Sequence, residues 1–207
     1  MAKNCNYKVT YFDITALGEP IRFLLAYGNF PFEDHRVKFD DWPALKPSMP
    51  FGQLPTFEIN GETFHQSMAI VRYLAKKVHL YGKSDEQALK IDMMADTVND
   101  LRQHIGKYFY HSDEKFKAQL RKTLYEETMP YYLKKFDKYV KDNNGYFVDG
   151  QLTYVDLYFV SLLDYIKYML DGKSLTDGYE NLQKLTAKVY QVPQIKTWLE
   201  KRPKTDR

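Results

Sequence analysis

Strand-forming patterns are confined to the first 77 residues of this 207-residue chain, and only helical patterns follow them. The predicted strands comprise residues 7–12, 32–39, 54–59 and 62–65. The last two are joined by Asn60-Gly61, which is the strongest short signal for a β-hairpin. Helices are predicted after the first strand and after the last one. Such an order, β-α-β followed by β-β-α, is typical of a small α/β domain of the thioredoxin type.

The two helices of this first unit have recognisable ends. Pro20 suits a first helical turn, because the N–H that it lacks would have no intrahelical partner there. Gly28 stands where a C′ glycine commonly ends a helix. Ser67 is predicted to be the N-cap of the second helix, whose apolar positions continue to Ala75.

From about residue 85 the chain is predicted to be all-helical. One long apolar stripe at helical spacing comprises Ile91, Met94, Ala95, Val98, Leu101 and Ile105. A looser helical pattern covers residues 115–141. Thr153 and Asp156 form a variant of the capping box that opens an apolar helix. Shorter helices are predicted near residues 179–190 and 194–201.

These patterns predict two domains. The first is an α/β thioredoxin-like domain over residues 1–78, and the second is an all-α helical domain over residues 85–207. Residues 78–84, which contain Gly82, form the predicted joint between them. No repeat, low-complexity segment or long linker is visible along the chain.

Charge and composition exclude several classes of protein. Lys plus Arg number 30 and Asp plus Glu 27, and a net charge of +3 is too balanced for a protein that coats nucleic-acid phosphates. No apolar run is long enough for a membrane span, and the first residues lack the apolar core of a signal peptide. The single cysteine, Cys5, excludes an internal disulfide framework. We expect a cytoplasmic protein without nucleic-acid or membrane partners.

The predicted thioredoxin-type domain lacks the thiol that such domains commonly use. The loop at residues 13–18 contains no cysteine, although the start of the following helix would favour a thiolate there. Cys5 precedes the first strand and is expected to be a bystander. Sulfur chemistry at this site would therefore require a ligand that brings its own sulfur. The five histidines show no metal-ligand spacing, so no metal site is expected.

Leu54-Pro55 precedes a predicted strand, which is a usual place for a cis proline in this architecture. A cis bond would turn the N–H and C=O of Leu54 outward, where they could pair with a peptide ligand as an added strand does. A trans proline that merely begins an edge strand explains the same residues. The sequence leaves the two alternatives open.

Two further features suit the carboxylates of a small thiol peptide. Gln66-Ser67 begins a helix whose free N–H groups attract anions, although an ordinary serine cap explains this position without a ligand. Trp42 and Lys46 lie four residues apart, so that an indole N–H and a cation could meet a second carboxylate. A solvated surface pair is the alternative for them. The order of these features along one α/β domain is more specific than any of them alone.

The motifs that carry these features resemble a known family. They are Thr10-Tyr11-Phe12, Leu17-Gly18-Glu19-Pro20-Ile21-Arg22, Asp41-Trp42-Pro43, Pro50-Phe51-Gly52-Gln53-Leu54-Pro55, Gln66-Ser67-Met68-Ala69-Ile70 and the Thr153-x-x-Asp156 box. Together they resemble the cytosolic glutathione S-transferases of the sigma class, and Ala16-Leu17-Gly18-Glu19-Pro20 is similar to arthropod members. The resemblance covers the whole chain and implies a thioredoxin-like domain, a helical domain and a homodimer.

The resemblance implies that Tyr11 is the catalytic hydroxyl, which donates a hydrogen bond to the sulfur of glutathione. Lowering the pKa of a thiol from about 8.5 by about 2 requires about 2.7 kcal/mol of preferential thiolate stabilisation. One hydroxyl donor to an anion supplies about 1.5–3 kcal/mol, and the start of the next helix adds a few tenths more. These magnitudes suffice without a metal. Without its neighbours, Tyr11 would be read as one of 18 tyrosines that packs in a strand.

The same resemblance implies a set of glutathione-binding residues besides Tyr11. They are Trp42, Lys46, Gln53, Leu54, Gln66, Ser67 and, from the partner chain of the dimer, Asp100. Gln66 and Ser67 would hold the γ-glutamyl carboxylate, and Leu54 the cysteinyl backbone. Trp42, Lys46 and Gln53 would face the glycyl end of glutathione. Asp100 would reach the γ-glutamyl ammonium across the two-fold interface, so that each site needs both chains.

The electrophile pocket is expected between the domains, lined by apolar and aromatic side chains. The positions that the resemblance suggests are Phe12, Leu17, Arg102, Tyr158 and Leu162. Each could equally be helix packing, which is the favoured interpretation for Leu162. Leu17 stands where vertebrate relatives often have an arginine, which makes prostaglandin isomerase activity less secure. Asn99 stands beside Asp100 where some relatives have two acids, which argues against a divalent-cation site.

The expected function is conjugation of glutathione to hydrophobic electrophiles, which include xenobiotics and lipid-peroxidation aldehydes. An alternative is a glutathione-dependent prostaglandin isomerase or peroxidase, which would use the same thiolate on another second substrate. A non-catalytic structural relative is a further alternative. Retention of Tyr11, Gln66 and Ser67 together argues against a non-catalytic role.

Overall fold

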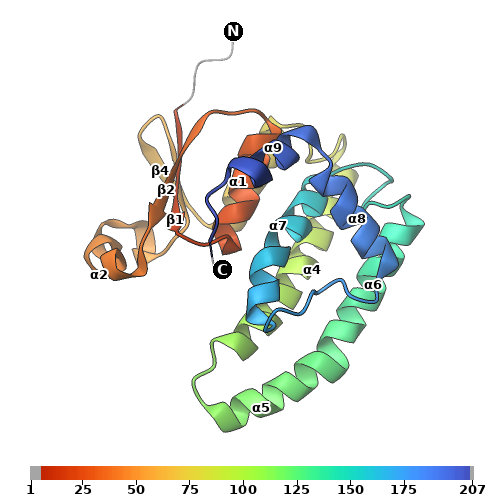
Figure 1. Ribbon diagram of the computed structural model, residues 1–207. Coiled ribbons are helices and arrows are strands. Elements are labelled where there is room, and N and C mark those ends of the chain that lie inside the picture. Colours follow the sequence, from red (N-terminus) through yellow and green to blue (C-terminus); the bar gives the residue numbers. More distant parts are fainter. Residues whose placement is uncertain (1–5, 206–207) are drawn as a thin grey trace.

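The computed structural model describes residues 6–205, so that Cys5 lies outside the described residues. It shows a sheet-containing layer beside a layer of helices (Figure 1). Within this range the strands are β1 (Tyr7–Phe12), β2 (Phe32–Val37), β3 (Thr56–Ile59) and β4 (Glu62–His65), and they form one sheet in the order β2-β1-β3-β4. β1 runs parallel to β2 and antiparallel to β3, and β3 runs antiparallel to β4. This mixed sheet is the thioredoxin-like arrangement that the strand order predicted.

The β3–β4 hairpin turns at the predicted dipeptide. Asn60 and Gly61 have φ angles of 53° and 89°, the left-handed values that both central residues of a type I′ turn require. Ile59 pairs with Glu62 directly across the turn. The register of β3 and β4 is therefore set by this dipeptide.

The sheet-containing layer also holds the helices α1 (Glu19–Tyr27), α2 (Trp42–Leu45) and α3 (Ser67–Lys77). α1 does end where predicted, but Gly28 is a right-handed C-cap with φ −76°, and Asn29 takes the left-handed conformation at φ 50°. A Cβ on Gly28 would lie 2.5 Å from the ring of Phe30. Close packing, and not the turn itself, therefore requires a glycine at this position.

The helical layer contains α4 (Asp85–Phe109), α5 (Glu114–Thr123), α6 (Met129–Asp142), α7 (Tyr154–Met169), α8 (Glu180–Tyr190) and α9 (Pro193–Lys201). A π-helical turn at Leu124–Thr128 joins α5 to α6. α7 packs against α4 on one side and against α1 on the other, and α9 returns to α1 (Figure 1). Residues 154–162 of α7 are all buried, and packing on both sides explains why most of them are apolar or aromatic.

The predicted capping box is present at the start of α7. The N–H of Thr153 donates to the Asp156 carboxylate at 2.7 Å, and the N–H of Phe147 donates to its other oxygen at 2.9 Å. Burial nevertheless raises the pKa of Asp156 to about 6. The carboxylate thus joins the start of the central helix to the segment that precedes it.

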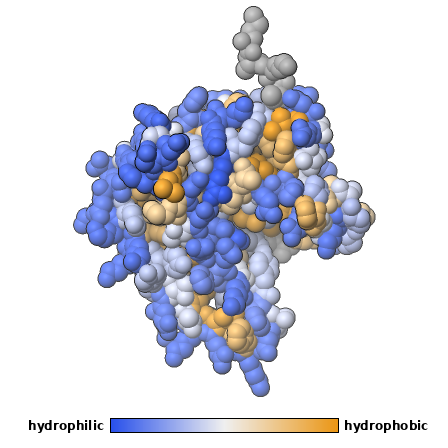
Figure 2. All heavy atoms as spheres, turned by 180° about the vertical axis from the view of Figure 1, so that it is seen from behind, coloured by the Kyte–Doolittle hydropathy of each residue, from blue (hydrophilic) through white to orange (hydrophobic). Residues whose placement is uncertain are grey.

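The outer surface is largely polar. The face in Figure 2 is mostly hydrophilic, and hydrophobic residues occur there in separate small patches. None of the helices formed by residues 6–205 combines the length and the apolar character that crossing a bilayer requires.

Candidate functional site

Tyr11 lies on β1 with its side chain directed at the loop that leads into α1. The residue is 6% exposed, and its hydroxyl oxygen accepts a hydrogen bond from the N–H of Leu17 at 3.4 Å. A Cβ on Gly18 would lie 2.6 Å from the Tyr11 ring, so this loop packs directly on the phenol. Burial raises the pKa of Tyr11 to about 12, against the opposing effect of the Leu17 N–H. At neutral pH the phenol therefore keeps its proton, which is available to an acceptor in the cavity.

A cavity of about 130 Å³ opens beside Tyr11 between the two layers. The loop contributes Ala16 and Leu17 to its wall. The helical layer contributes Arg102 and Gly106 from α4, Tyr110 directly after it, and Leu162, Tyr165, Ile166 and Met169 from α7. The cavity thus joins a buried phenol to a mostly apolar wall, as expected of a site for a small hydrophobic molecule.

Of the residues suggested for an electrophile pocket, Leu17, Arg102 and Leu162 line this cavity, although packing was the favoured interpretation for Leu162. Phe12 and Tyr158 are not among its lining residues. Phe12 stacks on the ring of Phe39 at a centroid distance of 4.8 Å. The Tyr158 hydroxyl donates to Asn99 at 3.3 Å.

Sequence reasoning did not identify Tyr110 and Tyr165, whose hydroxyls are hydrogen-bonded to each other at the cavity. A signal for Tyr110 was present in the spacing, because Arg102 and Gly106 on α4 and Tyr110, the C-cap of that helix, recur every four residues. Arg102 is held by Asn99, whose side-chain oxygen accepts its Nε–H at 2.9 Å. The cavity is therefore lined by a guanidinium and two tyrosine hydroxyls as well as by apolar side chains.

The Leu54–Pro55 peptide bond is cis, which answers the question that the sequence left open. Leu54 lies just before β3, outside the strand ladder. Within residues 6–205 neither its N–H nor its C=O has a hydrogen-bond partner. These backbone groups are available to an extended peptide ligand.

The start of α3 differs from the prediction. Ser67 is the first residue of the helix and not its N-cap, because Gln66 takes the N-cap position with a left-handed φ of 73°. Among the residues that the structure describes, no side chain caps this end. The first N–H groups of α3 therefore remain free to bind an anion such as a carboxylate.

Trp42, Lys46 and Gln53 all lie on the segment between β2 and β3. Trp42 begins α2 and is half-buried, with its ring 5.3 Å from that of Phe12. Lys46 and Gln53 are exposed. The indole is thus fixed by packing, whereas the cation and the amide are free to meet a ligand.

Asp100 is exposed on α4, two residues before Arg102. Two residues correspond to a rotation of about 200° around a helix. Since Arg102 lines the cavity, the Asp100 side chain points away from the site of its own chain. A role in glutathione binding would therefore have to be played in another chain.

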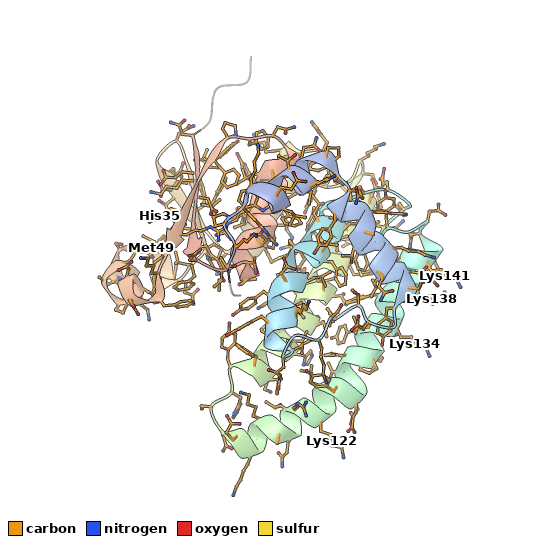
Figure 3. All side chains as sticks on the ribbon, in the orientation of Figure 1. His35, Met49, Lys122, Lys134, Lys138 and Lys141 are labelled. Atoms are coloured by element: carbon orange, nitrogen blue, oxygen red, sulfur yellow. The ribbon has the colours of Figure 1, made fainter. Side chains whose placement is uncertain are left out.

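Arg102 is the cation that borders the cavity. The lysines Lys122, Lys134, Lys138 and Lys141 project outward from α5 and α6, away from the sheet (Figure 3). In the part of the chain that the structure describes, no three His, Cys, Asp or Glu side chains are grouped to hold a metal ion. Positive charge at the cavity is therefore carried by one guanidinium.

Family models match both parts of the chain. Residues 7–76 match the glutathione S-transferase N-terminal domain, and residues 99–202 match the glutathione S-transferase C-terminal domain. A glutathione S-transferase of Anopheles gambiae is 46% identical over 201 residues, which cover 97% of this chain and 98% of that protein. A Mus musculus protein named hematopoietic prostaglandin D synthase is 35% identical over 97% of this chain and 98% of its own length.

Solved structures agree with these matches. The structure of prostaglandin synthase D of Nilaparvata lugens superimposes with a TM-score of 0.92 at 44% sequence identity, over 97% of this chain and 100% of that one. These proteins are thus similar to the chain over nearly its full length, in sequence, in the order of the domains and in fold. The chain therefore belongs to the glutathione S-transferase family, as its motifs predicted.

Proposed function

We propose that this chain is a sigma-class glutathione transferase that joins the thiolate of glutathione to hydrophobic electrophiles, among them xenobiotics and lipid-peroxidation aldehydes. The observation that carries the proposal is the Tyr11 phenol, buried at the wall of the cavity. Burial raises its pKa to about 12, so its proton is available for a hydrogen bond to sulfur at neutral pH. A hydrogen bond to a charged acceptor contributes about 1.5–3 kcal/mol, enough to make a bound thiol substantially more acidic.

Glutathione is proposed to lie along the edge of the sheet. Its cysteinyl backbone pairs with the N–H and C=O of Leu54, which have no partner in the described part of the chain. Its γ-glutamyl carboxylate binds at Gln66 and Ser67, where the uncapped start of α3 offers free N–H groups. The glycyl carboxylate reaches the segment between β2 and β3, which carries Trp42, Lys46 and Gln53. This placement directs the cysteinyl sulfur toward Tyr11.

A homodimer completes the proposed site, with Asp100 of one chain binding the γ-glutamyl ammonium in the other. Asp100 faces away from the cavity of its own chain, and Leu89 and Met93 on the same helix are 69% and 52% exposed. Phe51, in the turn before β3, is 85% exposed. Large apolar side chains at such exposure are expected to be covered by a partner.

The second substrate is proposed to combine an apolar body with a polar reacting end. Leu162, Ile166 and Met169 offer the apolar surface. Arg102 offers a positive charge, and the Tyr110–Tyr165 pair offers hydroxyls. Nitroaromatic compounds and α,β-unsaturated aldehydes meet this description, because negative charge develops on their oxygens when a thiolate adds.

Residues 1–78 are proposed to form the glutathione-binding domain and residues 85–207 the domain that supplies most of the electrophile pocket. The reaction as proposed uses glutathione as co-substrate and requires no metal, nucleic acid or membrane. The proposed location is the cytoplasm.

Tyr11→Phe tests the proposal, with Tyr73→Phe as the control at a tyrosine that packs against Phe57 away from the cavity. Tyr11→Phe should lower kcat/KM with a chloronitrobenzene about tenfold to a hundredfold, while glutathione still binds. Tyr73→Phe should retain the activity. Unchanged turnover by Tyr11→Phe would remove the mechanism.

Prostaglandin H2 and organic hydroperoxides serve as further substrates in the same assay. Several similar proteins are named prostaglandin D synthase, which favours testing isomerisation first. If the protein isomerises prostaglandin H2 faster than it conjugates a chloronitrobenzene, and if Tyr11→Phe loses the isomerisation, the same thiolate would be assigned to that reaction.

A further inference from the structure

Glu19, the first residue of α1, is connected to the C-terminal helix. Its side chain is 0% exposed. Its Oε1 accepts hydrogen bonds from the Trp198 indole and the Arg202 guanidinium, both at 2.8 Å. These donors lie 179 and 183 residues further along the chain. Because a buried carboxylate without partners is costly, these contacts bind α9 to the start of α1.

The other oxygen of Glu19 accepts from Arg22 at 3.2 Å. Arg22 is also fully buried, and the same nitrogen donates to the carbonyl oxygen of Ile14 at 2.9 Å. Its Nε donates to Asp34 on β2 at 2.8 Å. Ile14 and Glu19 bracket the loop that packs on Tyr11. Both ends of the loop are therefore held by one buried ion pair that is anchored to the sheet and to α9.

The loop needs this support, because its conformation is unfavourable in isolation. Ala16 has a left-handed φ of 34°, which a residue with a Cβ rarely adopts. The backbone of Gly18 lies against the Tyr11 ring. At 3.4 Å, the hydrogen bond from the Leu17 N–H to the phenol is long. A small displacement of the loop would therefore break it.

We propose that Glu19 is a positioning residue for Tyr11: through Trp198 of α9 and Arg202, which follows that helix, the C-terminal segment holds the Leu17 N–H against the phenol oxygen. This contact increases the acidity of the bound thiol. An N–H donated to the oxygen leaves the O–H to point into the cavity. It also polarises the hydroxyl and strengthens the hydrogen bond that the hydroxyl donates. The inference rests on the proposed role of Tyr11.

The primary test is Trp198→Phe, which removes one donor to Glu19 and keeps a ring against Phe32. The pKa of bound glutathione is read from the ultraviolet absorbance of the thiolate and from the pH profile of kcat/KM. We expect that pKa to rise by about 0.5 to 1, and kcat/KM on the acidic side to fall about threefold to tenfold. Glutathione affinity should not change. Glutathione binding can be followed through the fluorescence of Trp42, the one tryptophan left in this variant.

Ile195→Val is the matched control. Ile195 is a fully buried residue of α9, and its hydrocarbon side chain cannot form a hydrogen bond to Glu19. It should lower stability slightly and leave the thiol pKa unchanged. Glu19→Gln and Arg202→Gln should shift the thiol pKa in the same direction as Trp198→Phe. Arg202→Lys, which restores a cation, should shift it less than Arg202→Gln.

Tyr11→Phe in the same measurements separates the two proposals. A thiol pKa unchanged in Tyr11→Phe would refute the proposed role of Tyr11 itself. A pKa raised in Tyr11→Phe but unchanged in folded Trp198→Phe would overturn the positioning role and leave Tyr11 in place. An equal rise of the thiol pKa in Ile195→Val would also overturn the positioning role, because a general loss of packing around α9 would then explain the shift. Should Glu19→Gln fail to fold, Trp198→Phe alone decides.

Discussion

The guanidinium of Arg102 is held by the neutral side chain of Asn99, whose oxygen accepts the Arg102 Nε–H at 2.9 Å. The same oxygen accepts the hydroxyl of Tyr158 at 3.3 Å. Within the described residues no carboxylate forms an ion pair with Arg102, so its charge is not neutralised at the cavity wall. The amide positions the cation, and the cation remains available to a substrate.

Asn99→Asp is therefore expected to reduce activity without removing any hydrogen bond to Arg102. A carboxylate at this position would pair with the guanidinium and cancel its charge. We expect kcat/KM with a chloronitrobenzene to fall about threefold to tenfold. Arg102→Leu should cause a similar loss. Steady-state kinetics of both variants check this, and full activity in Arg102→Leu would show that the charge is not used.

Gly18→Ala should misplace the phenol of Tyr11. A Cβ there would lie 2.6 Å from the ring, so either the ring or the loop must move. Misplacement of a catalytic group by about 1 Å can cost about a hundredfold in rate, and we expect kcat/KM to fall at least about tenfold. Gly28→Ala is the matched glycine control, because its Cβ would clash with Phe30 away from the cavity. It should lower the free energy of unfolding and leave the activity of the folded protein intact.

Mixed dimers test whether Asp100 acts in the partner's site. We expect Asp100→Ala to raise the KM for glutathione, and Tyr11→Phe to lower kcat. If each site combines Tyr11 of one chain with Asp100 of the other, a mixed dimer of the two variants has one site with both defects and one intact site. Activity should therefore reappear when the variants are unfolded and refolded together. No recovery in confirmed mixed dimers would place Asp100 outside the partner's site.

Asp156 should make the protein less stable as the pH rises. Burial raises its pKa to about 6, above that of an aspartate in the unfolded chain. Its contribution to stability is thus complete below about pH 4 and is lost as the pH rises through about 6, by about 3 kcal/mol. Asp156→Asn cannot titrate. Urea unfolding of both proteins at about pH 4.5 and pH 7 should show the larger destabilisation by Asp156→Asn at the lower pH.

Asp92 should show the opposite pH dependence. Although burial opposes the effect, hydrogen bonds from Tyr154, Tyr81 and Arg72 lower the pKa of its carboxyl. A lowered pKa stabilises the fold above the ordinary aspartate range, and this contribution disappears as the pH falls. Asp92→Asn should lower the free energy of unfolding by about 2–3 kcal/mol at neutral pH and by less in acid. A loss independent of pH would show that the charge of Asp92 does not matter.

Local patterns predicted much of this structure. The strand order, the Asn60-Gly61 hairpin and the capping box of Thr153 and Asp156 each depend on residues close together in the sequence. The error at Ser67 arose at the same scale, because a left-handed Gln66 displaces the cap by one residue. Nothing in the local sequence pattern distinguishes the start of α3, where Ser67 is not the cap, from the start of α7, where Thr153 is.

Sequence alone determined the family and the order of elements, and it singled out Tyr11 as the candidate donor, because periodicity, turn dipeptides and motifs all reside in short segments. Only the tertiary structure decided that Tyr110 and Tyr165 meet at the cavity, that the backbone groups of Leu54 have no partner among residues 6–205, and that Glu19 is held by α9. The first and the last of these features join residues that are distant along the chain. The second depends on what surrounds Leu54. The two hydrogen-bonded contacts exist only after the two layers have packed, because packing brings side chains from distant segments together.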